Sequence, residues 1–277
     1  MSASSRIARE AKAWGNAHAR LTRARARGGT RHNEQGEPDA LAAAPPIEDW
    51  TTRPWRKLEK GVYRLQKRLL RAVCRDHVQA VHSLQCLVMK SDAARGRAVR
   101  RVTQDNQGKH TAGVDGITSV PPARRLTLVA RLRHADTIQP TPTRRVWIPK
   151  PGKAEQRPVG IPVMVDRAHQ ALVTLALEPE WEAKFEPNSD GVRPGRSVHD
   201  AIGALFQATG LKAKYVLDAD IQGCFDHIAH QPLRDKLHTY PARRRTITGW
   251  LKAGGLTRGI WTPTELGSPQ GGVVSPL

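Results

Sequence analysis

A hydrophobic run that ends on carboxylates constrains this chain more than any other feature of its sequence. Tyr215–Leu217 precede Asp218 and Asp220, and Phe225 follows five residues after Asp220. The pattern predicts a strand over Lys214–Asp220, in which alternation places Asp218 and Asp220 on one face. Carboxylates at a strand end are costly to bury unless a cation compensates them. The segment therefore indicates a Mg²⁺ site for phosphoryl or nucleotidyl transfer. The alternative is that one aspartate caps the following turn.

The charge balance points to a polyanionic partner. Lys and Arg number 45 against 25 Asp and Glu, which gives the 277-residue chain a formal net charge of +20. Such a chain repels itself unless a polyanion neutralises it, and nucleic acid is the commonest such partner. The sequence contains no apolar run long enough to cross a bilayer. It therefore predicts a protein that binds RNA or DNA and has no membrane partner.

The cysteines and histidines argue against a zinc site. Cys74, Cys86 and Cys224 are widely separated and include no Cys-x-x-Cys pair. They support neither a disulfide framework nor a zinc finger, which indicates a reducing, cytoplasmic location. His227 and His230 stand at metal-pair spacing, but no further ligand follows at a suitable distance, so structural hydrogen bonds are favoured.

The first part of the chain is basic and mostly helical. Residues 1–48 are rich in Ala, Arg and Gly and predict a flexible basic arm. From Trp55 to Val73, apolar residues recur at three- and four-residue steps, which predicts an amphipathic helix. A second helix is expected over about Asp76–Lys90. A third is expected from Ser91, which is a suitable N-cap.

Arginines cover the remaining surface of the third helix. Arg97, Arg100 and Arg101 have few acidic neighbours in the sequence, and Glu–Lys pairs at i,i+4 spacing are largely missing. Two interpretations stay open, a solvated helix face or contact with an RNA backbone. The charge balance favours the RNA contact.

The rest of the chain alternates short strands with helices. Arg144–Ile148 and Arg157–Ile161 are expected to form strands within hairpin distance of each other. A long buried helix is expected over about Val163–Phe185, with an interruption at Pro179. The other expected elements are helices near 232–239 and 242–253 and a hairpin near 256–266. This layout predicts a mixed fold of the α+β class.

Four further blocks surround the aspartates and carry glycine, proline and basic residues. They are Thr143–Gly152, Arg157–Pro162, Gly191–Ser197 and Gly267–Leu277. In this order, they resemble the successive sequence blocks of the group II intron reverse transcriptase/maturase family. The resemblance covers about residues 50 to 277 and includes Gly113–Gly116 in the helical region.

The resemblance implies an RNA-directed DNA polymerase that also takes part in intron splicing and mobility. Its implied partners are intron or template RNA, a DNA primer or target, and a dNTP. The implied fold is a right-hand polymerase. The resemblance implies a helical reverse transcriptase N-terminal domain over 49–135 and fingers with part of the palm over 136–277, and the basic arm over 1–48 precedes them as the third part of the chain.

The family's chemistry falls on few residues of this chain. Asp220 would be the first of three carboxylates that hold two Mg²⁺ ions, and Asp218 would be the less favoured metal ligand that supports it. Phe225 would lie against the sugar of the incoming nucleotide and exclude a 2′-hydroxyl by clash. Packing in the core is the alternative role for Phe225.

The strand hairpin carries the implied triphosphate contacts. Lys150 and Arg157 flank the hairpin tip, which in the family closes over the incoming triphosphate. Glu155 stands in the same loop, so Lys153 is a substitute candidate for the basic contact.

Two other blocks contribute polar groups. Gln270, beside glycines that allow close backbone approach, would contact a nucleotide or template sugar. Arg193 and Arg196 flank Gly195 in a tight turn that suits a nucleic-acid phosphate or a structural carboxylate equally well.

The family's Tyr-x-Asp-Asp block, which supplies the other two carboxylates, is expected after Leu277. We therefore expect an N-terminal fragment that is inactive alone and that a C-terminal chain could complement. The alternative from another class is a non-catalytic protein that binds intron or structured RNA, as a maturase remnant. A further alternative is a related reverse transcriptase of a bacterial defence system.

Overall fold

The computed structural model describes residues 49–150, 152, 154–210, 214–237 and 239–275. The chain forms two compact units, and the larger contains Pro54–Trp181 and Leu217–Leu277. The described residues of the smaller unit lie within 49–53 and 182–216. The basic arm expected over residues 1–48 lies outside the described residues.

Three helices open the larger unit, as the spacing of apolar residues predicts. They are α2 over Trp55–Val73, α3 over Val78–Lys90 and α4 over Asp92–Arg100. Leu69 and Ala72 of α2 pack with Val81 of α3 in a buried cluster. The Oγ of Ser91 accepts a hydrogen bond from the N–H of Ala94 at 3.4 Å, which confirms Ser91 as the N-cap of α4.

A long helix, α6, spans Met164–Lys184 and passes through Pro179 without the expected interruption. Proline has no N–H, so the carbonyl of Leu175, four residues earlier, loses its helical partner. Gln66 of α2 replaces that partner, because its Nε2 donates to the Leu175 oxygen at 3.0 Å. Gln66 is fully buried. A side-chain amide from a neighbouring helix thus explains why α6 continues.

Short helical segments connect α4 to the sheet. They are the π-helical turn η2 over Arg101–Asp105, the 3-10 turn η3 over Gln107–His110, α5 over Pro122–Arg131 and the 3-10 segment η4 over Leu132–Thr137. Buried Arg167 of α6 fixes this connection. Its Nε donates to the Pro162 oxygen at 2.8 Å, and its Nη1 donates to the Gly108 oxygen at 3.2 Å.

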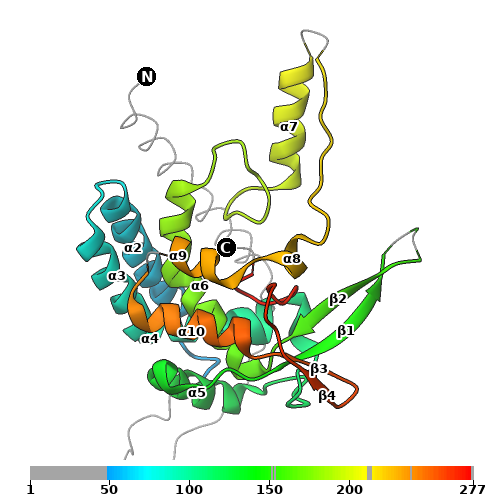
Figure 1. Cartoon of the computed structure of the whole chain (residues 1–277). Coiled ribbons are helices and arrows are strands. Elements are labelled where there is room, and N and C mark those ends of the chain that lie inside the picture. Colours follow the sequence, from blue (N-terminus) through cyan, green and yellow to red (C-terminus); the bar gives the residue numbers. More distant parts are fainter. Residues whose placement is uncertain (1–48, 151, 153, 211–213, 238, 276–277) are drawn as a thin grey trace, which may run out of the picture. The chain divides into compact units, whose positions relative to one another are not determined.

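The strands form one four-stranded sheet in the order β2-β1-β3-β4. They are β1 over Thr143–Pro149, β2 over Gln156–Ile161, β3 over Gly255–Thr257 and β4 over Ile260–Thr262. β1 pairs antiparallel with β2, with Arg144 opposite Ile161, and parallel with β3. The first two strands form a long hairpin that projects away from the helices (Figure 1). Both expected hairpins are confirmed.

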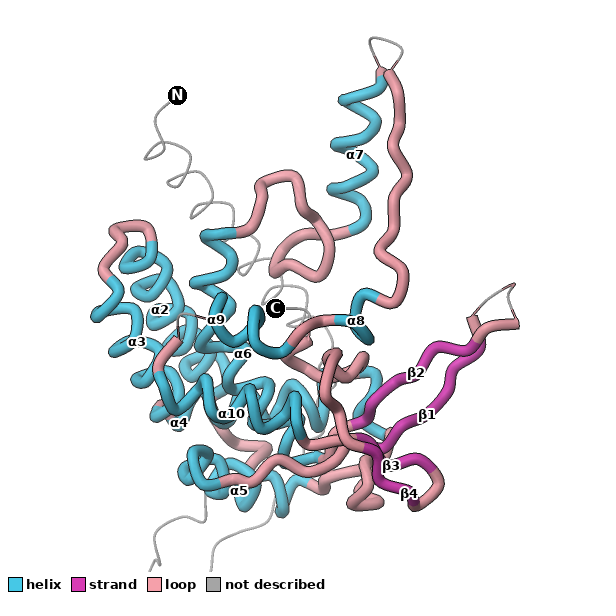
Figure 2. Tube along the Cα trace, in the orientation of Figure 1, coloured by secondary structure: helices cyan, strands magenta, loops and turns pink. Residues whose placement is uncertain are grey.

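The last helices of the larger unit are short. They are α8 over Cys224–His227, α9 over His230–Lys236 and α10 over Pro241–Lys252. Helices make up most of this unit, and the strands gather in one place beside them (Figure 2). The combination confirms the α+β class. No described helix is both long and apolar enough for a membrane span.

The smaller unit contains α7, over Val198–Thr209, which the sequence analysis did not anticipate. Ser197 caps it, since its Oγ accepts a hydrogen bond from the N–H of Asp200 at 3.3 Å. Val198, Ile202 and Phe206 recur at four-residue steps. That spacing and the cap are signals from which the helix could have been predicted.

The strand expected over Lys214–Asp220 is wrong. The segment has no regular secondary structure and forms no ladder with the described strands. Leu217 is 91% exposed, although its apolar side chain contributed to the strand prediction. A strand is stabilised by hydrogen bonds and side-chain packing from a neighbour. Alternation alone therefore does not place Asp218 and Asp220 on one face of a sheet.

Candidate active site

A cavity of about 240 Å³ lies where β1 and β2 meet the segment that follows β4. It is lined by Thr143, Arg145, Pro158, Gly160, Phe225, Asp226, Trp250, Gly254 and residues 263–270. Two residues that the sequence analysis assigned to one nucleotide site, Phe225 and Gln270, therefore line the same cavity. They come from α8 and from the segment Gly267–Gln270, which are far apart in the sequence.

Backbone hydrogen bonds hold Gly267–Gln270 between the sheet and α8. The N–H of Gly160, in β2, donates to the Gln270 oxygen at 2.7 Å. On the other side, the N–H of Ser268 donates to the Phe225 oxygen at 2.7 Å. The segment thus connects the hairpin to the turn that carries Phe225.

Glycines make this close approach possible. Gly267 has a φ of +85°, and a Cβ there would lie 2.7 Å from the Phe225 carbonyl oxygen. Gly271 has a φ of +106°, and a Cβ there would lie 2.9 Å from Cγ1 of Val159. Both positions require positive φ and leave no room for a side chain, so larger residues would push the segment away from its partners.

Two side chains anchor the same region. The Nε2 of buried His230 lies 2.7 Å from the Gly267 oxygen. The Oε1 of Gln170, in α6, accepts a hydrogen bond from the N–H of Val273 at 2.8 Å. His230 therefore has the structural role favoured from its sequence context, as does His227, whose Nδ1 lies 2.9 Å from the Gly223 oxygen. The sequence analysis missed Gln170, because nothing in a buried helical run indicates its distant partner.

Phe225 is half-buried at the rim of the cavity. It follows Gly223, whose φ of +59° starts the single turn of α8. The ring is therefore carried by a short helix rather than by a sheet. Partial exposure leaves part of the ring available for contact with a ligand.

Asp218 and Asp220 are exposed. The Oδ1 of Asp220 accepts a hydrogen bond from the N–H of Ile221 at 2.9 Å. Across the described residues, no three Asp, Glu, His or Cys side chains gather closely enough to hold a metal ion. Exposed carboxylates such as these suit Mg²⁺, which prefers oxygen ligands, keeps several waters and takes one or two carboxylates.

The basic residues of the hairpin differ in their surroundings. Lys150 forms an ion pair with Glu155, with 2.6 Å between Nζ and Oε2. Arg157 is exposed and forms no ion pair with a described carboxylate. Lys153 lies outside the described residues. Of Lys150 and Arg157, Arg157 is thus the residue whose charge no described carboxylate offsets.

In the smaller unit, both predicted arginines contact carboxylates. Arg193 is bidentate on Glu182, with Nη2 2.8 Å from Oε1 and Nε 3.2 Å from Oε2, and its side chain is only 5% exposed. Its Nη1 also donates to two carbonyl oxygens. Arg196 pairs with Asp190 at 3.1 Å. These contacts match the structural-carboxylate alternative.

The three arginines predicted to contact RNA, Arg97, Arg100 and Arg101, are not equivalent. Arg100 pairs with Glu59 at 3.4 Å and lies over the ring of Trp55, 4.9 Å from its centroid. Arg97 is half-buried, whereas Arg101 is exposed. Arg101 therefore remains the most accessible of the three.

Buried polar groups lie behind the cavity. The ring of His169 meets that of Trp250 edge-on at 5.0 Å, and burial, with the charge of Arg243 as the second cause, lowers the pKa of His169 to about 4. Burial also raises the pKa of Asp166, although the N–H of Thr141 donates to its Oδ2 at 3.0 Å. His169 is therefore neutral at pH 7.

Two matched domains identify this fold as that of a reverse transcriptase. Residues 50–132 match the N-terminal domain of reverse transcriptase, and residues 148–277 match reverse transcriptase (RNA-dependent DNA polymerase). The chain belongs to the group II intron reverse transcriptase/maturase family. Reverse transcriptases are metal-dependent polymerases that act on nucleic acids.

Several curated proteins are similar to the chain. Protein YkfC of Escherichia coli (strain K12) is 36% identical over 188 residues, which cover 64% of this chain and 49% of the relative. Group II intron-encoded protein LtrA of Lactococcus lactis subsp. cremoris is 34% identical over 180 residues, covering 62% of this chain and 29% of the relative. Maturase-like protein 1 of Euglena gracilis is 31% identical over 149 residues, covering 50% and 30%. The matched part thus spans half or less of each relative.

Proposed function

We propose that this chain supplies the fingers and part of the palm of an RNA-directed DNA polymerase that takes part in the splicing and mobility of a group II intron. The observation that carries the proposal is the shared cavity of Phe225 and Gln270 beside the hairpin strands. Within this proposal, residues 49–135 are the helical N-terminal domain and 136–277 are the fingers with part of the palm. The proposed location is the cytoplasm.

Each side chain has one task in the proposed site. Asp220, supported by Asp218, would hold Mg²⁺, which when bound compensates the negative charge of the nucleotide phosphates. Phe225 would exclude the 2′-hydroxyl of a ribonucleotide by clash. The amide of Gln270 would hydrogen-bond a nucleotide or template sugar.

The hairpin cations would bind the triphosphate of the incoming dNTP. Arg157 presents a planar guanidinium that suits two phosphate oxygens. Lys150 would have to leave Glu155 to do the same, so its contribution depends on the substrate competing with that carboxylate. Lys153 stays a candidate for the same task.

The helical region would bind the RNA partner. Exposed basic side chains recur every three or four residues along α2, which places them on neighbouring turns. They are Arg56, Lys60, Arg64, Lys67, Arg68 and Arg71. Arg101 extends the exposed charge beyond α4. This arrangement supports contact with a phosphate backbone, whereas Arg193 and Arg196 have their carboxylate partners.

The test is primer extension by a chimera in which residues 1–277 are followed by the part of the Lactococcus lactis relative that comes after its matched region. Asp220→Ala should abolish incorporation, because a metal ligand is lost. Asp218→Ala should reduce it about 10- to 100-fold, as expected for a supporting residue. Phe225→Ala should retain dNTP incorporation and increase ribonucleotide incorporation.

The matched control is Asp105→Ala, which removes another exposed aspartate and should leave the rate unchanged. A chimera that extends primers equally well with Asp220→Ala would refute the proposed catalytic site. If Asp218→Ala were the inactive variant instead, the assignment based on the spacing to Phe225 would be wrong.

A second candidate function is non-catalytic binding of intron or structured RNA. The basic face of α2 favours it, because those side chains do not depend on the aspartates. Salt-sensitive RNA binding by the chain, combined with a chimera that never extends a primer, would support this function over the polymerase.

A further inference from the structure

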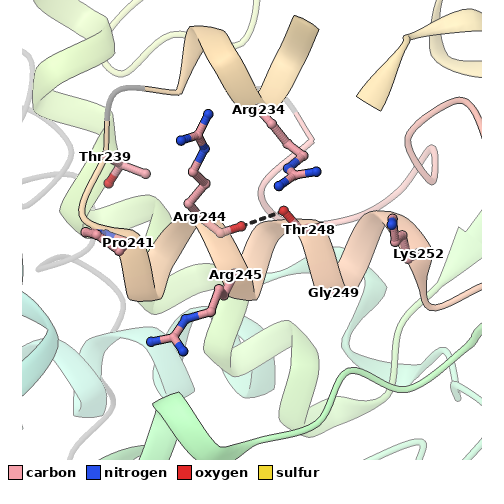
Figure 3. Close-up of a pocket in the computed structure, with 8 residues that line it drawn as sticks. All are labelled: Arg234, Thr239, Pro241, Arg244, Arg245, Thr248, Gly249 and Lys252. Atoms are coloured by element: carbon pink, nitrogen blue, oxygen red, sulfur yellow. Dashed lines mark hydrogen bonds between the residues drawn. The ribbon is translucent and has the colours of Figure 1, made fainter. Parts of the chain in front are cut away.

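A second, larger cavity lies between α9 and α10. Its volume is about 460 Å³, and its polar lining comes from Arg234, Thr239, Arg244, Arg245, Thr248 and Lys252. Arg234 extends from α9 toward α10, and Arg244 lies between the two helices (Figure 3). We refer to this cavity as the α9–α10 pocket.

Positive charge dominates the α9–α10 pocket. Four of the described residues that line it are Arg or Lys, and none of them is acidic. Asp235, beside the pocket, pairs with Arg244 at 3.0 Å and can compensate only one of these charges. Arg245 and Lys252 are exposed and form no ion pair with a described carboxylate. The pocket therefore keeps an excess of positive charge that an anion would neutralise.

The arginines also retain free donors. Arg234 donates through Nη1 to the Gln231 oxygen at 3.2 Å, but its Nε forms no hydrogen bond with the described residues. The same holds for the Nε of Arg244. Both Nε atoms are buried, so the donors through which these guanidinium groups would meet phosphate oxygens are their Nη groups.

The spacing of the cations favours a chain of phosphates over a single one. Arg244 and Lys252 are eight residues apart in α10, which corresponds to about 12 Å along the helix axis. Consecutive phosphodiesters can meet both ends at once, whereas a single phosphate would require both long side chains to converge on it. The volume lies within the range of about 300 to 1,000 Å³ typical of pockets for small ligands, so a single strand fits the pocket better than a duplex.

The lining also indicates how a strand would be recognised. Among the described residues that line the α9–α10 pocket none is aromatic, so these residues offer no platform for base stacking. Contacts from Arg and Lys to phosphates carry no sequence information. Binding should therefore be independent of sequence and strongly dependent on salt.

We propose that the α9–α10 pocket binds the sugar-phosphate backbone of single-stranded RNA. It is separate from the candidate active site, because Trp250 lines that site while Thr248 and Lys252 line this pocket. Residues 248 and 250 point in nearly opposite directions from a helix. The inference rests on the proposed function only in that the partner is a nucleic acid.

The test measures binding of a fluorescein-labelled 20-nucleotide RNA of mixed sequence to the full 277-residue chain, at several salt concentrations. Arg245→Ala with Lys252→Ala should flatten the slope of log K against log salt by roughly 1.4, since about 0.7 is lost per phosphate contact. That change weakens binding roughly tenfold at 0.15 M salt. Thermal unfolding verifies that the variant folds.

Two matched variants make the result specific. Lys236→Ala with Arg131→Ala removes the same charge from exposed positions outside the pocket and should preserve the slope. Arg245→Lys with Lys252→Arg keeps both charges and should also preserve it. An unchanged slope in the alanine pair, or an equal loss in the matched pair, would overturn the proposal.

Competitors at constant ionic strength separate the alternative anions. Inorganic phosphate at 10 mM should not displace the RNA, and a poly-glutamate peptide of the same charge should compete weakly. If either one displaced the RNA from the wild type but not from the alanine pair, the pocket would bind a small anion or an acidic peptide instead. Activity of the Asp220 variants is a separate measurement, so this proposal and the polymerase proposal can fail independently.

Discussion

Two motifs of the larger unit show opposite degrees of local organisation. Gly267–Gln270 is held by backbone hydrogen bonds to Gly160 and Phe225, and its glycines fit against neighbouring backbone. The segment with Asp218 and Asp220 is exposed, and its described backbone pairs with no strand. Gly267–Gln270 is ordered by its contacts with β2 and α8. The aspartate segment would need hydrogen bonds from a neighbouring strand to become a strand itself, and alternation of side chains cannot supply them.

The two motifs should also contribute differently to the free energy of unfolding. A segment that is packed through glycines cannot change without disturbing its partners. Exposed carboxylates leave the folded state nearly unaffected and are therefore free to serve chemistry. Substitutions in the two motifs should accordingly give very different free energies of unfolding.

The largest effect is expected from Gly267→Ala. A Cβ at this position would lie 2.7 Å from the Phe225 carbonyl oxygen, and the new alanine would have to adopt a φ of +85°. Strain and clash together should lower the free energy of unfolding by about 3 to 5 kcal/mol, measured in urea. Gly259→Ala is the control, because Gly259 has a φ of +84° and open space around it, so only about 1 to 2 kcal/mol should be lost. Equal losses would show that the clash is absent.

Acidification should lower the free energy of unfolding through buried His169, which lies behind the cavity. The pKa of His169 is about 4 in the folded protein against an ordinary value of 6.5. Below pH 6.5 the unfolded chain takes up a proton that the folded chain refuses, so stability falls as the pH drops from about 6.5 to about 4. The loss from this residue is up to about 3 kcal/mol.

His169→Leu should remove that part of the pH dependence, measured as urea unfolding between pH 7 and pH 4.5. Asp166 acts with the opposite sign, because its raised pKa makes the folded state gain stability as the carboxyl becomes protonated. The difference between wild type and variant isolates His169. Identical pH profiles would mean that the pKa of His169 is the same in the folded and unfolded states.

A smaller effect is expected from Gln66→Leu, which leaves the Leu175 carbonyl buried without a partner. The cost should be about 1 to 3 kcal/mol. In a Pro179→Ala background the helix regains its own N–H donor, so the same substitution should cost less, and the double-mutant cycle should show coupling. Exposed Gln79→Leu is the control. Additive losses would disprove the pairing of Gln66 with the proline.

The smallest effect should come from the aspartates. Asp218→Ala and Asp220→Ala should each change the free energy of unfolding by less than about 0.5 kcal/mol, because both side chains are exposed. A loss above about 1 kcal/mol for Asp220→Ala would indicate a structural role and weaken the contrast between the two motifs.

Much of the fold could be predicted because its signals are local. Apolar spacing and the Ser91 cap located α2 to α4, and proline and glycine punctuation located both hairpins. The strand over Lys214–Asp220 was wrong because a ladder needs a partner elsewhere in space. The interruption predicted at Pro179 was wrong because Gln66, which donates the hydrogen bond that the proline cannot, is more than a hundred residues away.

The candidate site was predictable only in part. Motif order identified Phe225 and Gln270, and the structure brings them to one cavity. Charge alone could not distinguish Arg193, which forms an ion pair with Glu182, from exposed Arg157. The α9–α10 pocket was not predicted, since its cations come from two helices whose packing the sequence does not specify.

The pairing of Gln66 with Pro179 has an evolutionary consequence, because the loss of stability depends on which of the two positions changes first. A chain that first replaces Pro179 recovers a helical N–H and releases Gln66 to vary afterwards. A chain that first replaces Gln66 must pass through a state with a bare, buried carbonyl. The path through position 179 is therefore open and the other is obstructed, so we expect relatives without the glutamine to lack the proline as well.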